Sequence, residues 1–219
     1  MRIVIAGAGR LGQEMAQVLA ATRNEVTLID SDDELVERLK NKISAQVIYG
    51  DACDPAVLEE AGALRADVLI AATGDDEDNL VVSLLAKRQF AVPRVVARAN
   101  YPENQWLFTD RWGVDVPVSA SSSLMSLIQE ATGSADTVGL LKLTGAGAGI
   151  IETTISSQSS AIGKTIAEIE LPPGSIVAAV MRKGVPNVPG GSFVLESGDE
   201  VLVVSEAATE ADIRRAFQQ

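Results

Sequence analysis

From residue 1 to about residue 118, short apolar runs alternate with longer segments whose apolar residues recur at helical spacing. Most of the short runs are apolar throughout, which is typical of strands that are buried on both faces of a sheet. The pattern predicts strands at 2–6, 25–29, 45–49, 68–72, 94–97 and 114–118, with helices at 12–22, 32–41, 54–61, 78–90 and 102–111. This alternation indicates βαβ units and therefore a Rossmann-like, doubly wound parallel sheet.

Two of these helices begin at residues that are typical of helix caps. In Asp54-Pro55, an acidic N-cap precedes a proline at the first helical position. Ser31-Asp32-Asp33-Glu34 fits a capping box that starts at Ser31.

The pattern changes in the second half of the chain. Residues 119–135 predict one amphipathic linker helix, with Leu124, Leu127 and Ile128 on a single stripe that we expect to contact another subunit. Beyond it, shorter runs between glycine and proline turns predict strands at 137–144, 149–155, 175–181 and 200–204, and helical segments at 165–169 and 209–217. We therefore expect a nucleotide-binding domain at 1–118, a linker helix at 119–135 and a small α+β domain at 136–219.

Composition excludes several classes of protein. The 47% of hydrophobic and 22% of charged residues are ordinary for a globular chain. The net charge of -12 disfavours nucleic acid as a partner. Since the sequence contains no histidine, the commonest general acid/base and metal ligand are absent. The single cysteine, Cys53, cannot form an internal disulfide and is expected to be a small buried hydrophobic residue. The short apolar run at residues 3–6 leads into a glycine turn, so we expect no signal peptide, and no apolar run is long enough to span a membrane.

A glycine-rich turn follows the first predicted strand directly and leads into the first helix. Gly7-Ala8-Gly9-Arg10-Leu11-Gly12 matches the G-x-G-x-x-G pattern of dinucleotide-binding proteins. In this pattern the first glycine permits a tight turn, the second lets the backbone approach a pyrophosphate, and the third allows close packing of helix and strand. The pyrophosphate lies at the positive N-terminus of the helix.

An acidic residue stands at the position where such a site binds ribose. Asp30 ends the second strand, 18 residues after Gly12, close to the roughly 20 expected for the ribose-binding carboxylate. Its charge would repel a 2′-phosphate, which favours NAD(H) or an adenine nucleotide over NADP(H). Ser31, the next residue, is included in the candidate site. The alternative is a helix-capping aspartate without a ligand.

Further candidates follow the third and fourth strands, at the sheet edge where ligands collect. They are Asp51 and Ala52 on the adenine side and Ala72, Thr73 and Gly74 on the side of the second ribose. The acidic run Asp75-Asp76-Glu77-Asp78 could bind a divalent cation, although carboxylates at this position more often interact with the helix dipole. The presence of a metal site is left open.

These motifs, together with several in the second half, give the chain a family resemblance over essentially its whole length. Besides the glycine turn and Asp30, the motifs are Gly50-Asp51-Ala52, Ala71-Ala72-Thr73-Gly74, Asp78-Asn79, Val95-Val96-Ala97-Arg98, Ile162-Gly163-Lys164-Thr165-Ile166, residues 176–184, Pro189 and residues 198–202. The chain resembles the RCK-domain regulatory subunits of Trk/Ktr potassium uptake systems, of the TrkA/KtrA type.

The resemblance implies a cytoplasmic regulator that binds NAD(H), ATP/ADP or AMP and gates a membrane potassium transporter of the TrkH/KtrB type. It implies a peripheral location at the inner face of the plasma membrane. A chain with one N-terminal and one C-terminal unit would form a homo-oligomer, from a dimer up to a ring, or pair with a second RCK subunit. Whether the C-terminal domain binds cyclic di-AMP or a metal is left open.

The resemblance also implies roles for single residues. Asp30 would hold the adenosine ribose, and Asp51 and Ala52 would border the adenine. Thr73, Gly74 and Asn79 would line the far side of the ligand. Arg10 and Arg98 would place positive charge near the phosphates, with Arg10 able to act across a subunit boundary; the alternative for either arginine is a surface or structural ion pair.

The residues leave two other functions open. A small NAD-dependent oxidoreductase would need a proton relay at the nicotinamide, and the sequence offers neither a histidine nor a recognisable tyrosine–lysine pair. A redox-responsive transcription regulator is disfavoured by the acidic charge and the missing basic helix. A regulator without catalysis needs only a ligand that prefers one of two conformations.

Overall fold

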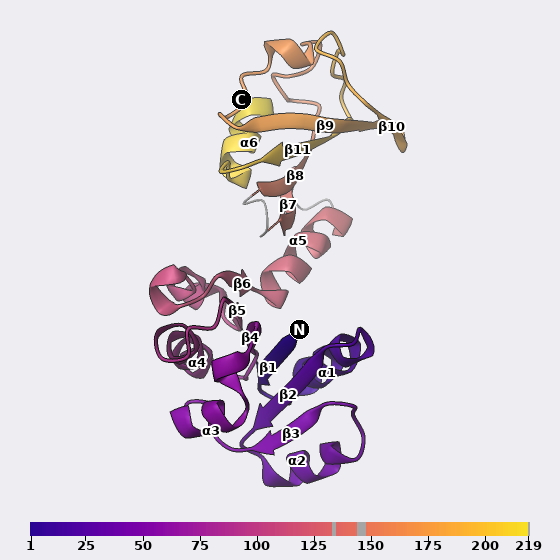
Figure 1. The fold of residues 1–219 in the computed structure, drawn as a ribbon. Coiled ribbons are helices and arrows are strands. Elements are labelled where there is room, and N and C mark those ends of the chain that lie inside the picture. Colours follow the sequence, from indigo (N-terminus) through magenta and orange to yellow (C-terminus); the bar gives the residue numbers. More distant parts are fainter. Residues whose placement is uncertain (133–134, 144–147, 219) are drawn as a thin grey trace. The chain divides into compact units, whose positions relative to one another are not determined.

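The computed structural model describes residues 1–132, 135–143 and 148–218. It divides into two compact units, Met1–Ser121 and Ser122–Gln219 (Figure 1). Among the described residues, no helix combines the length and the apolar character needed to cross a membrane.

The N-terminal unit is built on a parallel sheet of six strands in the order β3-β2-β1-β4-β5-β6. The strands are β1 Arg2–Ala6, β2 Glu25–Asp30, β3 Gln46–Tyr49, β4 Val68–Ala71, β5 Arg94–Arg98 and β6 Val116–Val118. Since β1 pairs with both β2 and β4, the strand order reverses beside β1. This arrangement confirms the predicted doubly wound sheet and places its ligand-binding crevice at the carboxyl ends of β1 and β4.

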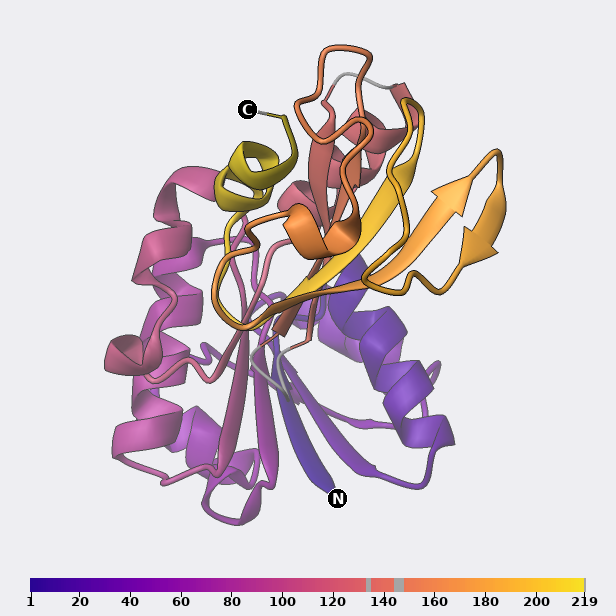
Figure 2. The same cartoon turned by 90° about the horizontal axis from the view of Figure 1, so that it is seen from above.

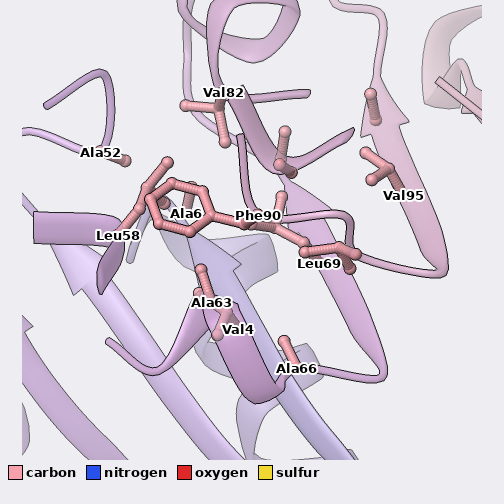
Figure 3. Packing of buried hydrophobic residues seen from close by; sticks show 14 of the residues in the cluster. Val4, Ala6, Ala52, Leu58, Ala63, Ala66, Leu69, Val82, Phe90 and Val95 are labelled. Atoms are coloured by element: carbon pink, nitrogen blue, oxygen red, sulfur yellow. The ribbon is translucent and has the colours of Figure 1, made fainter. Parts of the chain in front are cut away.

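Helices cover both faces of this sheet (Figure 2). They are α1 Arg10–Ala21, α2 Asp33–Lys40, α3 Pro55–Glu60 and α4 Asp76–Arg88. Because side chains alternate along a strand, Ile3 and Ile5 of β1 pack in the core with α1 and α2, while Val4 and Ala6 pack in the core with α3 and α4. Figure 3 shows the second of these cores, in which the Phe90 ring lies close to Leu58.

Two details of the predicted elements were wrong. The N-cap of α2 is Asp32, not Ser31, and its side chain accepts a hydrogen bond from the Leu35 N–H at 3.0 Å. The segment 102–111 is not one helix but two short 3₁₀ turns, Pro102–Leu107 and Asp110–Trp112. The interruption turns Phe108 into the core, where it is 2% exposed, so burial of this ring outweighs helical continuity. The Asp54 cap of α3 is confirmed, since its side chain accepts from the Ala56 N–H.

The C-terminal unit is an antiparallel sheet in the order β10-β9-β11-β8-β7. Its elements are β7 Thr137–Leu143, β8 Ala148–Thr154, β9 Ser175–Arg182, β10 Val185–Asn187, β11 Glu200–Ser205 and α6 Glu210–Gln218. Strand β10 was not predicted, because it has only three residues. Its hairpin with β9 turns through Lys183 and Gly184, which both have positive φ, at 54° and 75°. The predicted helical segment 165–169 is a 3₁₀ turn, Ile166–Glu168, closed by a capping box between Thr165 and Glu168.

The core of this unit lies between the sheet and α6, where Ile213 and Phe217 are fully buried. A helix, α5 Ala120–Thr132, lies in the region predicted as the linker, of which residues 133 and 134 are outside the described part. Leu124 and Ile128 of its predicted stripe are exposed, and the side chain of Leu127 is outside the description.

Candidate functional site

The carboxyl ends of the parallel strands border a cleft of about 600 Å³ that lies wholly within the N-terminal unit. Most of the residues that the sequence singled out line it: Gly7, Gly9, Arg10, Leu11, Asp30, Ser31, Asp51, Ala52, Ala72, Thr73, Gly74 and Arg98. Gly12 and Asn79 are not among the lining residues and lie behind them. The topology of the sheet thus brings together residues that are up to 91 positions apart in the sequence.

Each glycine of the turn has a separate steric role. Gly7 has φ +100°, and a Cβ there would lie 2.8 Å from the Ala72 carbonyl oxygen, so only glycine lets β1 end this close to β4. A Cβ on Gly12 would lie 1.9 Å from the Gly7 carbonyl oxygen, which is why helix α1 can pack directly against the turn. A Cβ on Gly9 would meet nothing within 4 Å, because this residue borders the open cleft.

The N-terminus of α1 differs from that of the neighbouring helices. Its N-cap is Gly9, which provides no side-chain hydrogen bond, and its first turn has no acidic residue. By contrast, α2 is capped by Asp32, and α4 carries Asp76, Glu77 and Asp78 in its first turn. The N–H groups and positive dipole end of α1 are therefore not neutralised by the helix's own side chains, which suits them to bind an anion.

The Asp30 carboxylate lies beside this helix end and is held in place by backbone groups. Its Oδ2 accepts a hydrogen bond from the Ala8 N–H at 2.6 Å, and its Oδ1 accepts one from the Asp32 N–H at 2.9 Å. Each carboxylate oxygen has further acceptor capacity. Asp30 can therefore also accept hydrogen bonds from the two hydroxyl groups of a ribose in the cleft.

On the β3 side, Asp51 and Cys53 form a small turn at the cleft wall. The Asp51 Oδ1 accepts a hydrogen bond from the Cys53 N–H at 2.8 Å. Cys53 is only partly buried, although it packs against the core as expected for a small hydrophobic residue. Burial, together with the charges of Asp78 and Asp51, raises the pKa of the thiol to about 12. Because the thiolate is the reactive form, this thiol is a poor nucleophile at neutral pH.

Asn79 supports the cleft wall without lining it, since its side chain is fully buried. Its Oδ1 accepts hydrogen bonds from the Thr73 N–H at 2.8 Å and the Thr73 hydroxyl at 2.9 Å. Its Nδ2 donates to the Arg98 carbonyl oxygen at 2.9 Å. One amide side chain thus fixes the ends of both β4 and β5 relative to each other.

The two candidate arginines are in different situations. The Arg10 side chain is 93% exposed, and its Nε lies 3.2 Å from the Glu14 carboxylate one turn along α1. Arg98 also lines the cleft, and its guanidinium has no ion pair within the part of the chain that the structure describes. Arg98 is thus the cleft cation that is free to approach a phosphate.

The acidic run at the start of α4 separates into residues with different roles. Asp76 is 1% exposed and accepts hydrogen bonds from the Asn100 N–H at 2.6 Å, the Asn104 amide at 2.9 Å and the Tyr101 N–H at 3.2 Å. Burial alone would raise the pKa of Asp76, but these hydrogen bonds outweigh it and hold the pKa below its ordinary value. Asp76 therefore anchors the loop that follows β5. Within the described ranges, no group of three or more His, Cys, Asp or Glu side chains is arranged to hold a metal ion.

The cleft also contains residues that the sequence did not single out as site residues: Glu14, Ile29, Asp32, Leu35, Gly50, Cys53, Asp75 and Asp78. Glu14 lies one turn inside α1 and Leu35 lies in the first turn of α2, so the helical period of 3.6 could have indicated that they border the cleft. Asp75 and Asp78 were considered only as metal ligands or dipole partners.

The fold and the cleft together define a protein class, a Rossmann-fold nucleotide-binding unit joined to a small antiparallel α+β unit. Residues 3–120 match the TrkA-N domain and residues 150–218 match the TrkA-C domain. The Trk system potassium uptake protein TrkA of Mycobacterium tuberculosis is 39% identical over 215 residues, which cover 98% of this chain and 97% of that protein. The chain belongs to the TrkA family.

Solved structures share the fold. The structure titled "GsuK channel bound to NAD" matches 98% of this chain and 39% of that chain, with a TM-score of 0.58 and 19% identity. The AMP-bound form of the Kef C-terminal domain from Shewanella denitrificans matches 62% of this chain and 83% of that chain, with a TM-score of 0.50 and 25% identity.

Proposed function

We propose that this chain is a non-catalytic regulatory subunit that senses an adenine nucleotide and gates a membrane potassium transporter of the TrkH/KtrB type. The ligand is NAD(H), ATP/ADP or AMP, bound in the cleft at the end of the parallel sheet. The observation that carries the proposal is the uncapped N-terminus of α1 beside the backbone-held Asp30 carboxylate. The two groups are complementary to a phosphate and to the ribose attached to it.

The relatives support the same ligand class and partner. The M. tuberculosis relative is named for potassium uptake, and the structural neighbours are titled as bound to NAD and to AMP. In this proposal the cleft residues Asp51 and Ala52 border the adenine, while Thr73, Gly74 and Arg98 contact the rest of the ligand, with Asn79 and Gly12 supporting them from behind. In this proposal the chain forms a homo-oligomer or pairs with a second RCK subunit, and the assembly lies at the inner face of the plasma membrane.

Regulation of this kind requires no catalytic reaction in the cleft. A ligand that binds one conformation about 100-fold more tightly than another shifts their equilibrium by about 2.7 kcal/mol. None of the described lining residues is a histidine, tyrosine or lysine, so no observation favours the alternative of a small NAD-dependent oxidoreductase.

Calorimetry and thermal unfolding with NAD⁺, NADH, ATP, ADP and AMP test the proposal. A ligand at 100 times its dissociation constant stabilises the native state by about 2.7 kcal/mol, which raises the melting temperature measurably. We expect Asp30→Ala to weaken binding by at least about tenfold, since the ribose hydroxyls lose a charged acceptor. Asp30→Asn keeps only one of the two backbone hydrogen bonds that Asp30 accepts and removes the charge, so it should also weaken binding.

Asp33→Ala is the matched control, since Asp33 lies near Asp30 at the start of α2 but does not line the cleft. It should leave nucleotide affinity unchanged. The absence of binding by every adenine nucleotide at millimolar concentration would refute the proposed function. So would an Asp30→Ala variant that is folded and retains full affinity.

A further inference from the structure

The edge of the N-terminal sheet that lies opposite the cleft carries exposed cations. Since the six strands are parallel, all of them begin at this edge, which the N label of Figure 2 marks at the start of β1. We call it the amino edge and define it as the first residue of each strand together with the turn that leads into it. Five exposed cations lie in these segments or at the end of α4 and have no ion pair among the described residues: Arg23, Lys42, Arg65, Arg88 and Arg94.

The carboxylates of the amino edge, by contrast, already have partners within the unit. The Glu25 carboxylate lies 3.4 Å from the Arg2 guanidinium. Asp67 accepts a hydrogen bond from the Arg2 N–H at 2.7 Å. The Asp115 carboxylate lies 2.7 Å from the Lys87 ammonium, in the last turn of α4. The positive charge of the five unpaired cations is therefore left over.

The amino edge is thus positive on a chain that is strongly negative. Even when Glu59 and Glu60 at the end of α3 are counted with it, its seven cations outnumber five carboxylates. The whole chain has a net charge of -12. At the carboxyl edge, the turns after β2, β3 and β4 contain acidic residues and no basic one. An anionic partner is therefore attracted to the amino edge and repelled by the overall charge of the chain.

Two exposed apolar side chains lie among these cations. Leu64, which precedes Arg65 in a 3₁₀ turn, is 61% exposed, and Met1 beside Arg2 is 66% exposed. The two segments are adjacent, because the Arg2 guanidinium donates a hydrogen bond to the Arg65 carbonyl oxygen at 3.5 Å. Apolar side chains gain little from a phosphodiester backbone, but they leave water when they enter the interface of a bilayer. Cations combined with exposed apolar groups favour an anionic lipid surface over nucleic acid as the partner.

The arrangement of the strands makes the amino edge suitable for a flat partner. Neighbouring strands lie about 4.8 Å apart, so the six strand starts form a row about 24 Å long. The nucleotide cleft lies at the opposite edge of the same sheet. A surface that binds the amino edge therefore leaves the cleft open to its ligand.

We propose that the amino edge docks on the anionic phospholipid surface of a membrane. The unpaired cations attract the lipid phosphates, and Leu64 enters the interface between headgroups and acyl chains. This inference goes beyond the proposed function, which requires contact with a transporter but not with lipid. The attraction depends on ionic strength, since salt screens interactions between exposed charges.

The test is sedimentation of the full chain with vesicles made of equal parts of phosphatidylglycerol and phosphatidylcholine. Vesicles of phosphatidylcholine alone serve as the uncharged comparison. Each basic residue near an anionic membrane strengthens binding about fivefold. We expect binding to the mixed vesicles at a salt concentration of about 0.1 M and at least about tenfold weaker binding at about 0.5 M. The uncharged vesicles should bind at least about tenfold more weakly at either salt concentration.

Two triple variants with the same change in charge locate the binding surface. The first removes three cations at the starts of β3, β4 and β5 and should weaken vesicle binding at least about tenfold: Lys42→Gln, Arg65→Gln and Arg94→Gln. The matched control removes three exposed cations of the C-terminal unit and should weaken binding less than about twofold: Lys164→Gln, Lys183→Gln and Arg214→Gln. Thermal unfolding checks that both variants are folded.

Leu64→Ser separates the apolar contribution from the charge. It changes no charge at an exposed position, so it should leave the fold intact and weaken binding to the mixed vesicles about threefold or more. Binding of the chain to duplex DNA, if it occurs, should be unaffected by this substitution.

Three outcomes would overturn the inference. They are equal binding to charged and uncharged vesicles, an equal loss of binding in the two triple variants, and binding to duplex DNA without binding to vesicles. In the last case the amino edge would be a nucleic-acid surface. Since no nucleotide ligand is present in these experiments, their failure would leave the proposed function standing, and a failure of nucleotide binding would leave this inference standing.

Discussion

The two units of the molecule use their polar groups in opposite ways. In the N-terminal unit, the α1 N-terminus has no side-chain cap and Arg98 has no ion pair among the described residues, and both border the cleft. In the C-terminal unit, the buried Asp199 forms a two-point ion pair with Arg182, at 2.8 Å to Nε and 2.7 Å to Nη2. Arg182 is also held by Glu196 and by the Phe193 ring, 4.8 Å away.

The difference shows how to distinguish a binding site from a structural cluster of charges. A group whose hydrogen bonds and charge are satisfied within the fold contributes to stability and has little left for a ligand. A group held in place by the backbone but left without a partner can interact with a ligand at no further cost of ordering. By this criterion the cleft of the N-terminal unit has the character of a binding site, and the Arg182–Asp199 pair holds its own unit together.

The largest effect is expected from a single methyl group in the glycine turn. Gly12→Ala would place its Cβ 1.9 Å from the Gly7 carbonyl oxygen, so the helix or the turn must move. We expect a loss of about 3 kcal/mol in the free energy of unfolding and faster hydrogen exchange in β1 and α1. Urea unfolding and hydrogen-exchange mass spectrometry measure both. Gly9→Ala, in the same turn but with no neighbour within 4 Å, should cost less than about 1 kcal/mol.

In the C-terminal unit, the corresponding test is Arg182→Met. It leaves the Asp199 carboxylate buried without its cation, which typically costs about 3 kcal/mol in unfolding free energy. Faster hydrogen exchange should appear in β9 and β11 and not in the cleft. Arg215→Met is the control, because the Arg215–Asp212 pair is on the surface and is expected to contribute less than about 0.5 kcal/mol. A stability of Arg182→Met equal to that of the control would contradict the structural role of the pair.

A smaller effect, present in both units, is expected on acidification. Burial raises the pKa of Asp76 and Asp199, but hydrogen bonds outweigh it and leave both pKa values below the ordinary value. Stability from such groups is fully present above the unfolded-state pKa, near 4, and is lost as the pH falls through the lowered folded-state value. We expect urea unfolding to show a loss of about 1 to 2 kcal/mol between pH 5 and pH 3. In Asp76→Asn this loss should be smaller, because one of the two carboxylates no longer titrates. An unchanged pH dependence would show that Asp76 does not contribute.

Several features of the fold follow from short-range patterns in the sequence. Six apolar runs separated by helical periodicity indicated the parallel sheet, and the glycine turn indicated where its first helix begins. The boundaries were less well predicted where a tertiary contact overrides the local preference. At 102–111, burial of Phe108 breaks what the periodicity predicts as a helix, and at 185–187 a strand forms only because the preceding turn folds it back onto β9.

The candidate site likewise has features that local spacing in the sequence predicts and features that only the fold shows. The spacing from Gly12 to Asp30 is local to one βα unit, so it could be recognised without a structure. The role of Asp76 could not, because its partners Asn100 and Asn104 are 24 and 28 residues away. The burial of Asn79 and the exposure of Asp75, four positions apart in one acidic segment, also became distinguishable only in the folded chain.

The sequence by itself determined most of the elements, the glycine turn and the acidic residue that ends the second strand, because backbone sterics and side-chain periodicity act over a few neighbouring residues. Only the tertiary structure decided which polar groups face each other and which face the cleft. Such pairings join residues that are far apart in the chain, and they depend on the order in which the strands assemble, with β1 between β2 and β4.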